Sequence, residues 1–165
     1  MILGGMSLQT FTVLHVIISL IAIASGLIVL FGMLGSKRLA GWTALFLLAT
    51  ILTSVTGFMF PIHGFTPALG TGIVSLVVLA IALLALYGKR LAGNWRWMYV
   101  ATAVTALWFN VLVLIVQAFQ KVASLNAMAP TQSEPPFLIA QSGALAIFVV
   151  LGVVAGIKFR SAPTP

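Results

Sequence analysis

The sequence lacks cysteine and aspartate, and Glu134 is its one acidic residue. Without cysteine, disulfide exchange, thiolate catalysis and thiolate binding of metals are excluded. Glycosidase sites that need two carboxylates are excluded, and so are two-metal and phosphoryl-transfer sites that need several. A Ser-His-Asp triad would depend on Glu134 as its acid. An enzyme is therefore the least favoured class of function.

Charge of either sign is scarce. Charged residues make up 5% of the 165 residues and hydrophobic residues 62%, whereas a soluble domain has roughly 25% charged residues. A surface this poor in charge could not stay dissolved in water. The sequence therefore predicts a single domain, residues 1–165, whose solvent and main partner is membrane lipid.

Five apolar runs are each long enough to cross a bilayer. They cover about residues 9–34, 40–60, 70–87, 97–119 and 137–157. A backbone in lipid must satisfy its own hydrogen bonds, so each run is predicted to be a helix. The predicted fold class is an all-α membrane protein, a bundle of five transmembrane helices.

The basic residues lie in short connections and at helix ends. They are Lys37, Arg38, Lys89, Arg90, Arg96, Lys121, Lys158 and Arg160. All but Lys121 fall in the first connection, the third connection or the tail, and this bias predicts that these segments face the cytoplasm. The N-terminus is then outside and the C-terminus inside. The net charge of +7 is explained by orientation in the membrane, and nucleic acid is not expected as a partner.

A pentapeptide repeats within the chain. Residues 37–41, Lys-Arg-Leu-Ala-Gly, recur at 89–93, an offset of 52 positions (89 minus 37). At the same offset Ala49, Thr50 and Thr53 match Ala101, Thr102 and Thr105. This pattern predicts that the first two helices form a hairpin that is duplicated as the third and fourth, with the fifth helix added. The alternative is that any tight turn at this membrane face favours basic residues and glycine.

Polar side chains gather in the outer half of the predicted bundle. They are His15, Ser19, Thr53, Thr56, Asn110, Gln117, Glu134 and Gln141. Polar groups in lipid-spanning segments are costly and mark functional sites. Helical spacing places several of them on shared faces, and Glu134 could close the group from the fourth connection. We predict a polar pocket here that binds a lipid-soluble or small ligand.

Other interpretations of these residues stay open. Ser, Thr, Asn and Gln also bridge helices as packing contacts, each contributing about 1 kcal/mol or less, and this interpretation is favoured for Thr50, Thr53, Thr102 and Thr105. His15 is either a structural hydrogen-bonding group or a ligand. If the second connection dipped into the membrane, His63 could join His15 as a haem ligand.

Small residues four positions apart let helices approach closely. One such pair is Ala22 and Gly26 in the first helix, and another is Gly152 and Gly156 in the fifth. The pairs serve either packing within the bundle or a contact between copies of the chain.

Three segments carry a resemblance. Residues 37–46 read Lys-Arg-Leu-Ala-Gly-Trp-Thr-Ala-Leu-Phe, 53–58 read Thr-Ser-Val-Thr-Gly-Phe, and 129–137 read Ala-Pro-Thr-Gln-Ser-Glu-Pro-Pro-Phe. They resemble an uncharacterised family of small bacterial inner-membrane proteins. The resemblance implies location in the inner membrane and adds no catalytic residues.

Two classes of function follow from these features. The first is a protein that binds a lipid, quinone, haem or other small ligand in the polar pocket, or an accessory subunit of a membrane complex. The alternative is an oligomeric channel or transporter, and a haem-binding electron-transfer protein is a lesser one. The sequence leaves open the cofactor and whether the chain forms a homo-oligomer.

Overall fold

The computed structural model describes residues 7–61, 64 and 67–160, and every regular element in this part of the chain is helical. The elements are α1 (Leu8–Leu34), α2 (Ala40–Gly57), α3 (Pro67–Leu83), a π-helical turn η2 (Leu84–Gly88), α4 (Trp95–Lys121), α5 (Ala123–Met128) and α6 (Pro135–Lys158). The all-α prediction is confirmed.

The five predicted spans are also confirmed. Five helical segments in the described ranges are long and apolar enough to cross a membrane, and they cover residues 8–34, 40–57, 69–88, 95–121 and 135–158. The second span ends at Gly57, three residues earlier than the predicted 60. The predicted fourth connection contains the short helix α5, which the hydropathy pattern did not indicate.

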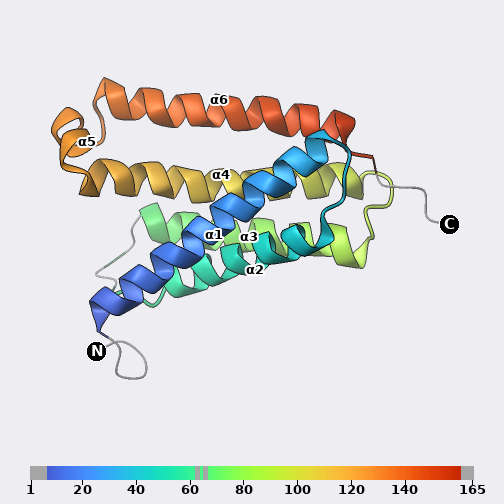
Figure 1. Cartoon of the computed structure of the whole chain (residues 1–165), viewed down its shortest axis with the longest axis horizontal. Coiled ribbons are helices and arrows are strands. Elements are labelled where there is room, and N and C mark those ends of the chain that lie inside the picture. The colour runs from blue at the N-terminus through green and yellow to red at the C-terminus, as the bar shows by residue number, and fades with distance from the viewer. Residues whose placement is uncertain (1–6, 62–63, 65–66, 161–165) are drawn as a thin grey trace.

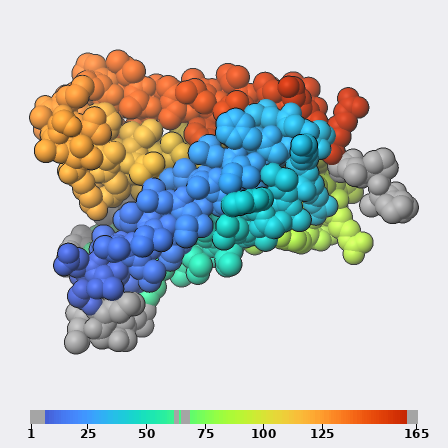
Figure 2. All heavy atoms as spheres, viewed as in Figure 1, coloured from blue at the N-terminus to red at the C-terminus, as the bar shows by residue number. Residues whose placement is uncertain are grey.

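The helices form a bundle in which α1 crosses the others obliquely (Figure 1). Helix α1 packs mainly on α2 and also contacts α4 and α6, while α4 lies between α3 and α6. The space-filling view shows α1 spread diagonally over the front of the molecule (Figure 2). Helix α6 packs on α4 and α1 along one side only, and most of its remaining side chains are exposed to lipid.

Buried side chains from four of the spans meet in the middle of the bundle. The largest of them include Leu30, Phe46, Leu47, Leu79, Val100 and Leu107. The outer surfaces are equally apolar: Ile139 is 71% exposed, Phe31 63% and Ile157 62%. Large exposed apolar surfaces are rare on soluble monomers, so this surface matches a hydrocarbon solvent.

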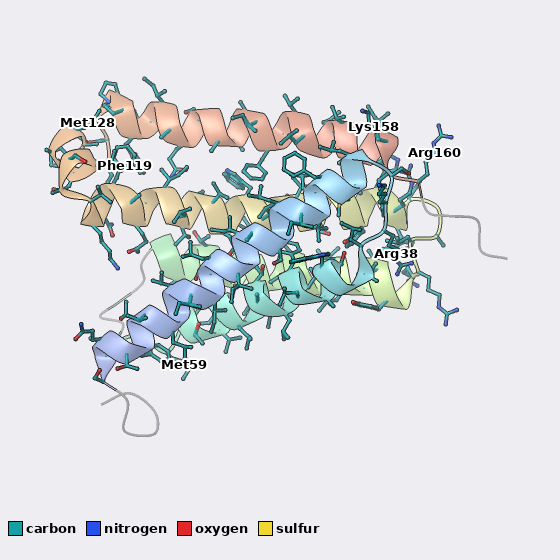
Figure 3. The ribbon with its side chains drawn as sticks, in the orientation of Figure 1. Arg38, Met59, Phe119, Met128, Lys158 and Arg160 are labelled. Carbon is teal, nitrogen blue, oxygen red and sulfur yellow. The ribbon has the colours of Figure 1, made fainter. Side chains whose placement is uncertain are left out.

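The two ends of the bundle differ in charge. The seven basic residues outside α4's last turn lie at the end where α1 meets α2 and where α6 finishes, which we call the basic end. Arg38, Lys158 and Arg160 mark it in Figure 3, and Phe119 and Met128 mark the opposite, far end. This gathering is what the charge pattern predicted, while the membrane side that each end faces stays a prediction.

At the basic end, α4 and α6 are tied by Arg96. Its guanidinium Nη1 donates a hydrogen bond to the Gly156 carbonyl over 2.9 Å and another to the Phe159 carbonyl. Carbonyls in the last turn of a helix have no partner within the helix, so Arg96 caps α6. Close by, the backbone N–H of Arg160 donates to Ser36 Oγ over 3.1 Å.

The glycines of both predicted small-residue pairs lie against other helices of the same bundle. A Cβ built on Gly26 would lie 2.6 Å from a Leu107 methyl group and 2.8 Å from the Phe46 ring. A Cβ on Gly156 would lie 2.1 Å from the Trp97 ring. These glycines therefore serve close packing within one chain.

The two copies of the repeated pentapeptide form different turns. In the first copy, Leu39 immediately precedes α2 and Ser36, just upstream, has a φ of 54°. In the second copy, Arg90 and Leu91 have φ values of 49° and 61°. There α4 begins two residues after the pentapeptide, at Trp95.

Candidate functional site

His15 and Thr56 join α1 to α2 in the far half of the bundle. His15 Nδ1 lies 2.8 Å from Thr56 Oγ1, which is hydrogen-bonding distance. The histidine is seven residues from the start of α1, or about 10 Å along the helix axis. Both residues belong to the predicted polar pocket, and the structure brings them together because α1 crosses α2 here.

The hydrogen bonds around Thr56 favour the tautomer of His15 that carries its proton on Nδ1. A threonine hydroxyl has one proton, and Thr56 Oγ1 donates it to the Leu52 carbonyl over 2.6 Å, with the Thr53 carbonyl at 3.3 Å. With its proton directed to the Leu52 carbonyl, the oxygen accepts a hydrogen bond from His15 Nδ1–H. In the neutral imidazole the other nitrogen, Nε2, consequently carries the lone pair.

His15 Nε2 has no hydrogen-bond partner among the residues that the structure describes. The ring is half-buried beside two aromatic side chains. Its centroid lies 5.2 Å from that of Phe60 in an edge-on arrangement, and Phe60 lies 5.0 Å from Phe11. The result is an oriented hydrogen-bond acceptor with aromatic neighbours.

Ser19 and Thr53 lie near His15 without extending its hydrogen bonds to other helices. The Ser19 hydroxyl donates to the His15 carbonyl of its own helix over 2.8 Å. Thr53 Oγ1 is buried and has no partner among the described residues. Of these neighbours, Thr56 alone is seen to hold the imidazole from another helix.

Asn110 forms a second, separate contact. Its Nδ2 donates to Thr50 Oγ1 over 3.0 Å, and the Thr50 hydroxyl donates to the Phe46 carbonyl over 2.8 Å. This pair joins α4 to α2, which agrees with the packing interpretation of Thr50. Gln117, seven residues further along α4, is half-buried and forms no hydrogen bond with the described residues.

Gln141 forms a third contact, between α6 and α4. Its Nε2 donates to the Leu112 carbonyl over 3.2 Å, and its Oε1 is buried without a partner in the described part of the chain. Because the carbonyl of Leu112 requires a donor, it also fixes which atom of the amide is nitrogen.

Glu134 bonds to its own connection. Its carboxylate accepts hydrogen bonds from the Thr131 hydroxyl over 2.8 Å and from the backbone N–H groups of Thr131 and Ser133. Partial desolvation raises the pKa of Glu134, but these hydrogen bonds outweigh it and the net shift is downward.

The predicted site residues thus divide into local contacts, and those at His15 and Gln141 each leave an acceptor without a partner among the described residues. No cluster of three or more metal-ligating side chains occurs in the described ranges. His63, the second histidine proposed as a haem ligand, lies outside the described residues.

A groove between α4 and α6 was not predicted. It has a volume of about 260 Å³, and its lining includes Trp97, Thr105 and Trp108 of α4 and Phe148 of α6. The indole Nε1 of Trp108 is buried without a hydrogen-bond partner in the described structure. The α4 side of the groove could have been found in the sequence, because Trp97, Thr105 and Trp108 fall close to one helical face. The α6 side could not, because its lining residues do not differ in type from the rest of that apolar helix.

The fold and these contacts define an integral membrane protein with five candidate spans. No family model, no curated protein and no solved structure matches the chain. The resemblance to small bacterial inner-membrane proteins accordingly gives no family to which the chain can be assigned.

Proposed function

We propose that this protein binds a lipid-soluble molecule at His15, through a hydroxyl group that donates a hydrogen bond to Nε2. The observation that carries the proposal is the unpaired Nε2 acceptor, held in place because Thr56 accepts the proton of Nδ1. An intramembrane titratable side chain is costly, and here one of its two nitrogens has no protein partner in the described residues.

The geometry favours a ring that carries a hydroxyl. The lone pair of Nε2 accepts a hydrogen bond and cannot form one with a carbonyl oxygen, which is itself an acceptor. Phe60 and Phe11 offer apolar and ring-edge contacts to an aromatic ligand. At about 10 Å along α1, the site lies within reach of a head group near the edge of the hydrocarbon core. A quinol meets these requirements better than its oxidised quinone.

The other functions that the sequence suggested have less support. A haem protein would need a second ligand, for which His63 was proposed, and His63 lies outside the described residues. A channel, a transporter or an accessory subunit is supported by no particular contact on these helices. Binding of a hydroxyl-bearing ligand is therefore the function that we put forward.

The test compares a decyl quinol with the corresponding decyl quinone under anaerobic conditions. The protein is placed in phosphatidylcholine nanodiscs, and binding is measured by equilibrium dialysis. One hydrogen bond gained or lost corresponds to about a tenfold change in affinity, so the quinol should bind about tenfold more tightly than the quinone. Equal binding of the two forms would contradict the proposal, even before any variant is made.

Variants then locate the hydroxyl. His15→Phe keeps a ring and should abolish the preference for quinol. Thr56→Val removes the acceptor of Nδ1–H, frees the imidazole to move its proton to Nε2, and should reduce the preference. Ser19→Ala is the matched control, since Ser19 bonds to a carbonyl of its own helix, and it should leave the preference unchanged.

A further inference from the structure

The groove between α4 and α6 occupies the half of the bundle next to the basic end. Its lining runs along α4 from Trp97 to Trp108, or about 16 Å, and along α6 from Leu145 to Val153, or about 12 Å. Trp97 stands in the first turn of α4, and Val153 stands near the last turn of α6. Half of a hydrocarbon core is about 15 Å thick. The groove therefore has the length of one leaflet of the bilayer.

The groove opens sideways, toward the surface that faces lipid. Among its lining residues Trp97 is 43% exposed, Val149 56% and Val153 54%. The walls are apolar apart from Thr105 and the indole N–H groups. The volume of about 260 Å³ exceeds the roughly 150 Å³ of a cavity that holds benzene and is below the range of about 300–1,000 Å³ of pockets for drug-sized ligands. A hydrocarbon chain suits this space, and a head group has to lie beyond its end.

Arg96 lies at the end of the groove next to the basic end. Its guanidinium carbon is 5.4 Å from the centre of the Trp97 ring, which lines the groove. In the described residues its hydrogen bonds go through Nη1 alone, to the carbonyls of Gly156 and Phe159. A guanidinium has five N–H donors and often binds phosphate through two of them. The groups on Nε and Nη2 are therefore left for an anion.

No acidic side chain in the sequence is available to balance the basic end. Glu134 is the one acidic residue, and it directly precedes α6 at the far end. Lys158 and Arg160 are exposed where α6 finishes, close to the helix end that Arg96 caps (Figure 3). Basic residues near a membrane surface attract anionic lipids, each raising the affinity roughly fivefold. A lipid head group can supply the anion that the side chains of this end lack.

We propose that the groove holds one acyl chain of an anionic phospholipid from the leaflet at the basic end, and that Arg96 binds its phosphate. The length and apolar walls of the groove select the chain, and the unbalanced charge selects the anionic head group. A zwitterionic lipid carries its own cation, so it gains less from Arg96. This site lies on α4 and α6, whereas the His15 site lies on α1 and α2, so either proposal can fail without the other.

The experiment measures quenching of tryptophan fluorescence in phosphatidylcholine nanodiscs at physiological ionic strength. The discs contain rising fractions of phosphatidylglycerol with brominated chains, or of phosphatidylcholine with the same chains. Bromine in the groove should quench Trp97 and Trp108, and phosphatidylglycerol should reach half of its effect at a roughly fivefold lower fraction. Equal quenching by the two lipids would overturn the proposal. So would relief of quenching by glycerophosphoglycerol, the head group without chains, because a free phosphate would then suffice.

Charge variants test the role of Arg96. Arg96→Gln should abolish the preference for phosphatidylglycerol, whereas Arg96→Lys keeps the charge and should retain most of it. Lys89→Gln is the matched control, since Lys89 lies over the ring of Trp95, 5.5 Å from its centre, at the end of the helix on the other side of α4. A helix is about 10 Å across and screening acts over about 8 Å, so the control should change the preference by less than about twofold. Equal losses in the two Arg96 variants would mean that this residue only caps α6, and would overturn the proposal.

A filled groove tests the seat of the chain. Ala101 lines the groove and is exposed, so Ala101→Leu places a larger side chain where the acyl chain would lie. The preference for phosphatidylglycerol should fall from about fivefold to about twofold or less. Ala146→Leu makes the same change at an exposed position of α6 outside the groove lining, and it should leave the preference unchanged. A full preference in Ala101→Leu would show that anionic lipid binds the basic end without the groove, which contradicts the proposal.

Discussion

The two copies of Lys-Arg-Leu-Ala-Gly show how little a short sequence decides about its own backbone. In the first copy, the last two residues, Ala40 and Gly41, already belong to α2. In the second copy the equivalent residues, Ala92 and Gly93, stand outside α4, and Gly93 has a φ of 53°. Identical residues are helical in one hairpin and form a turn in the other.

The neighbours of the pentapeptide explain the difference. Gly35 follows α1 directly, and its N–H bonds to the carbonyls of Phe31 and Gly32. The equivalent residue in the second hairpin is Tyr87, and there the helix continues through the π turn to Gly88. Because this helix ends later, the chain reverses within the pentapeptide itself, where Arg90 and Leu91 take positive φ angles that cost non-glycine residues about 1–2 kcal/mol each.

The largest expected difference between the hairpins concerns Gly26. Its counterpart in the second hairpin is Val78, so the glycine that lets α1 approach Phe46 and Leu107 closely has no equivalent in α3. Gly26→Ala should destabilise the protein by roughly 1–3 kcal/mol through overpacking. Gly41→Ala is the control, because a Cβ there meets nothing within 4 Å. Thermal unfolding in detergent, followed by circular dichroism, should show a lower midpoint for Gly26→Ala alone.

Thr50 and Thr102 provide the next comparison. Thr50 accepts a hydrogen bond from Asn110, whereas Thr102 donates to carbonyls of its own helix. Thr50→Val leaves the Asn110 amide unpaired and should cost about 1 kcal/mol. Thr102→Val should cost less than half of this in the same unfolding assay. Equal losses would mean that the contact with Asn110 contributes nothing.

Glycine at the two equivalent arginines should have opposite effects. Arg90→Gly removes a Cβ from a left-handed position and should stabilise the protein by about 0.5–1 kcal/mol. Arg38→Gly adds freedom to the unfolded chain without relieving strain, and should destabilise it by a few tenths of a kcal/mol. Denaturant titrations of the two variants measure both, and stabilisation by Arg38→Gly would contradict the backbone assignment.

The smallest expected effect is that of pH on the connection that follows the second hairpin. After the second hairpin, Glu134 orders Thr131 and Ser133, and its pKa lies below the ordinary value of 4.5. The hydrogen bonds to the carboxylate are fully present above pH 4.5, and they are lost as the pH falls through the lowered pKa of Glu134 in the folded protein. NMR chemical shifts of the Thr131 and Ser133 amides should follow this titration, and Glu134→Gln should remove it. Amides that do not titrate would show that the carboxylate does not hold the loop.

The spans could be predicted because lipid imposes one simple requirement on sequence. A segment in hydrocarbon must be apolar and helical over about 20 residues, and that requirement is local. The π turn at Leu84–Gly88, the end of α2 at Gly57 and the helix α5 are not set by this requirement, because none of them is a long apolar run. Hydropathy therefore does not locate them.

The candidate sites divide in the same way. His15 stands out in an apolar run, and its depth follows from counting residues, but its pairing with Thr56 depends on the angle at which α1 crosses α2. Gln141 bonds to a backbone carbonyl, and because every residue has one, the sequence does not show which carbonyl it is. The groove depends on how α6 packs against α4 at Gly152 and Gly156. Because the sequence does not show this packing, Trp108 could not be distinguished from an ordinary interface tryptophan.

The hydrogen-bonded contact at the basic end, in which Arg96 ties α4 to α6 and Arg160 bonds to Ser36, has a consequence for biosynthesis. It joins atoms from Ser36, Arg96 and the stretch from Gly156 to Arg160, and Phe159 within it is 2% exposed. It cannot form without α6, because its parts come from the end of α1, the start of α4 and the end of α6. Closure of this end therefore has to wait until translation has delivered α6 to the helices that precede it.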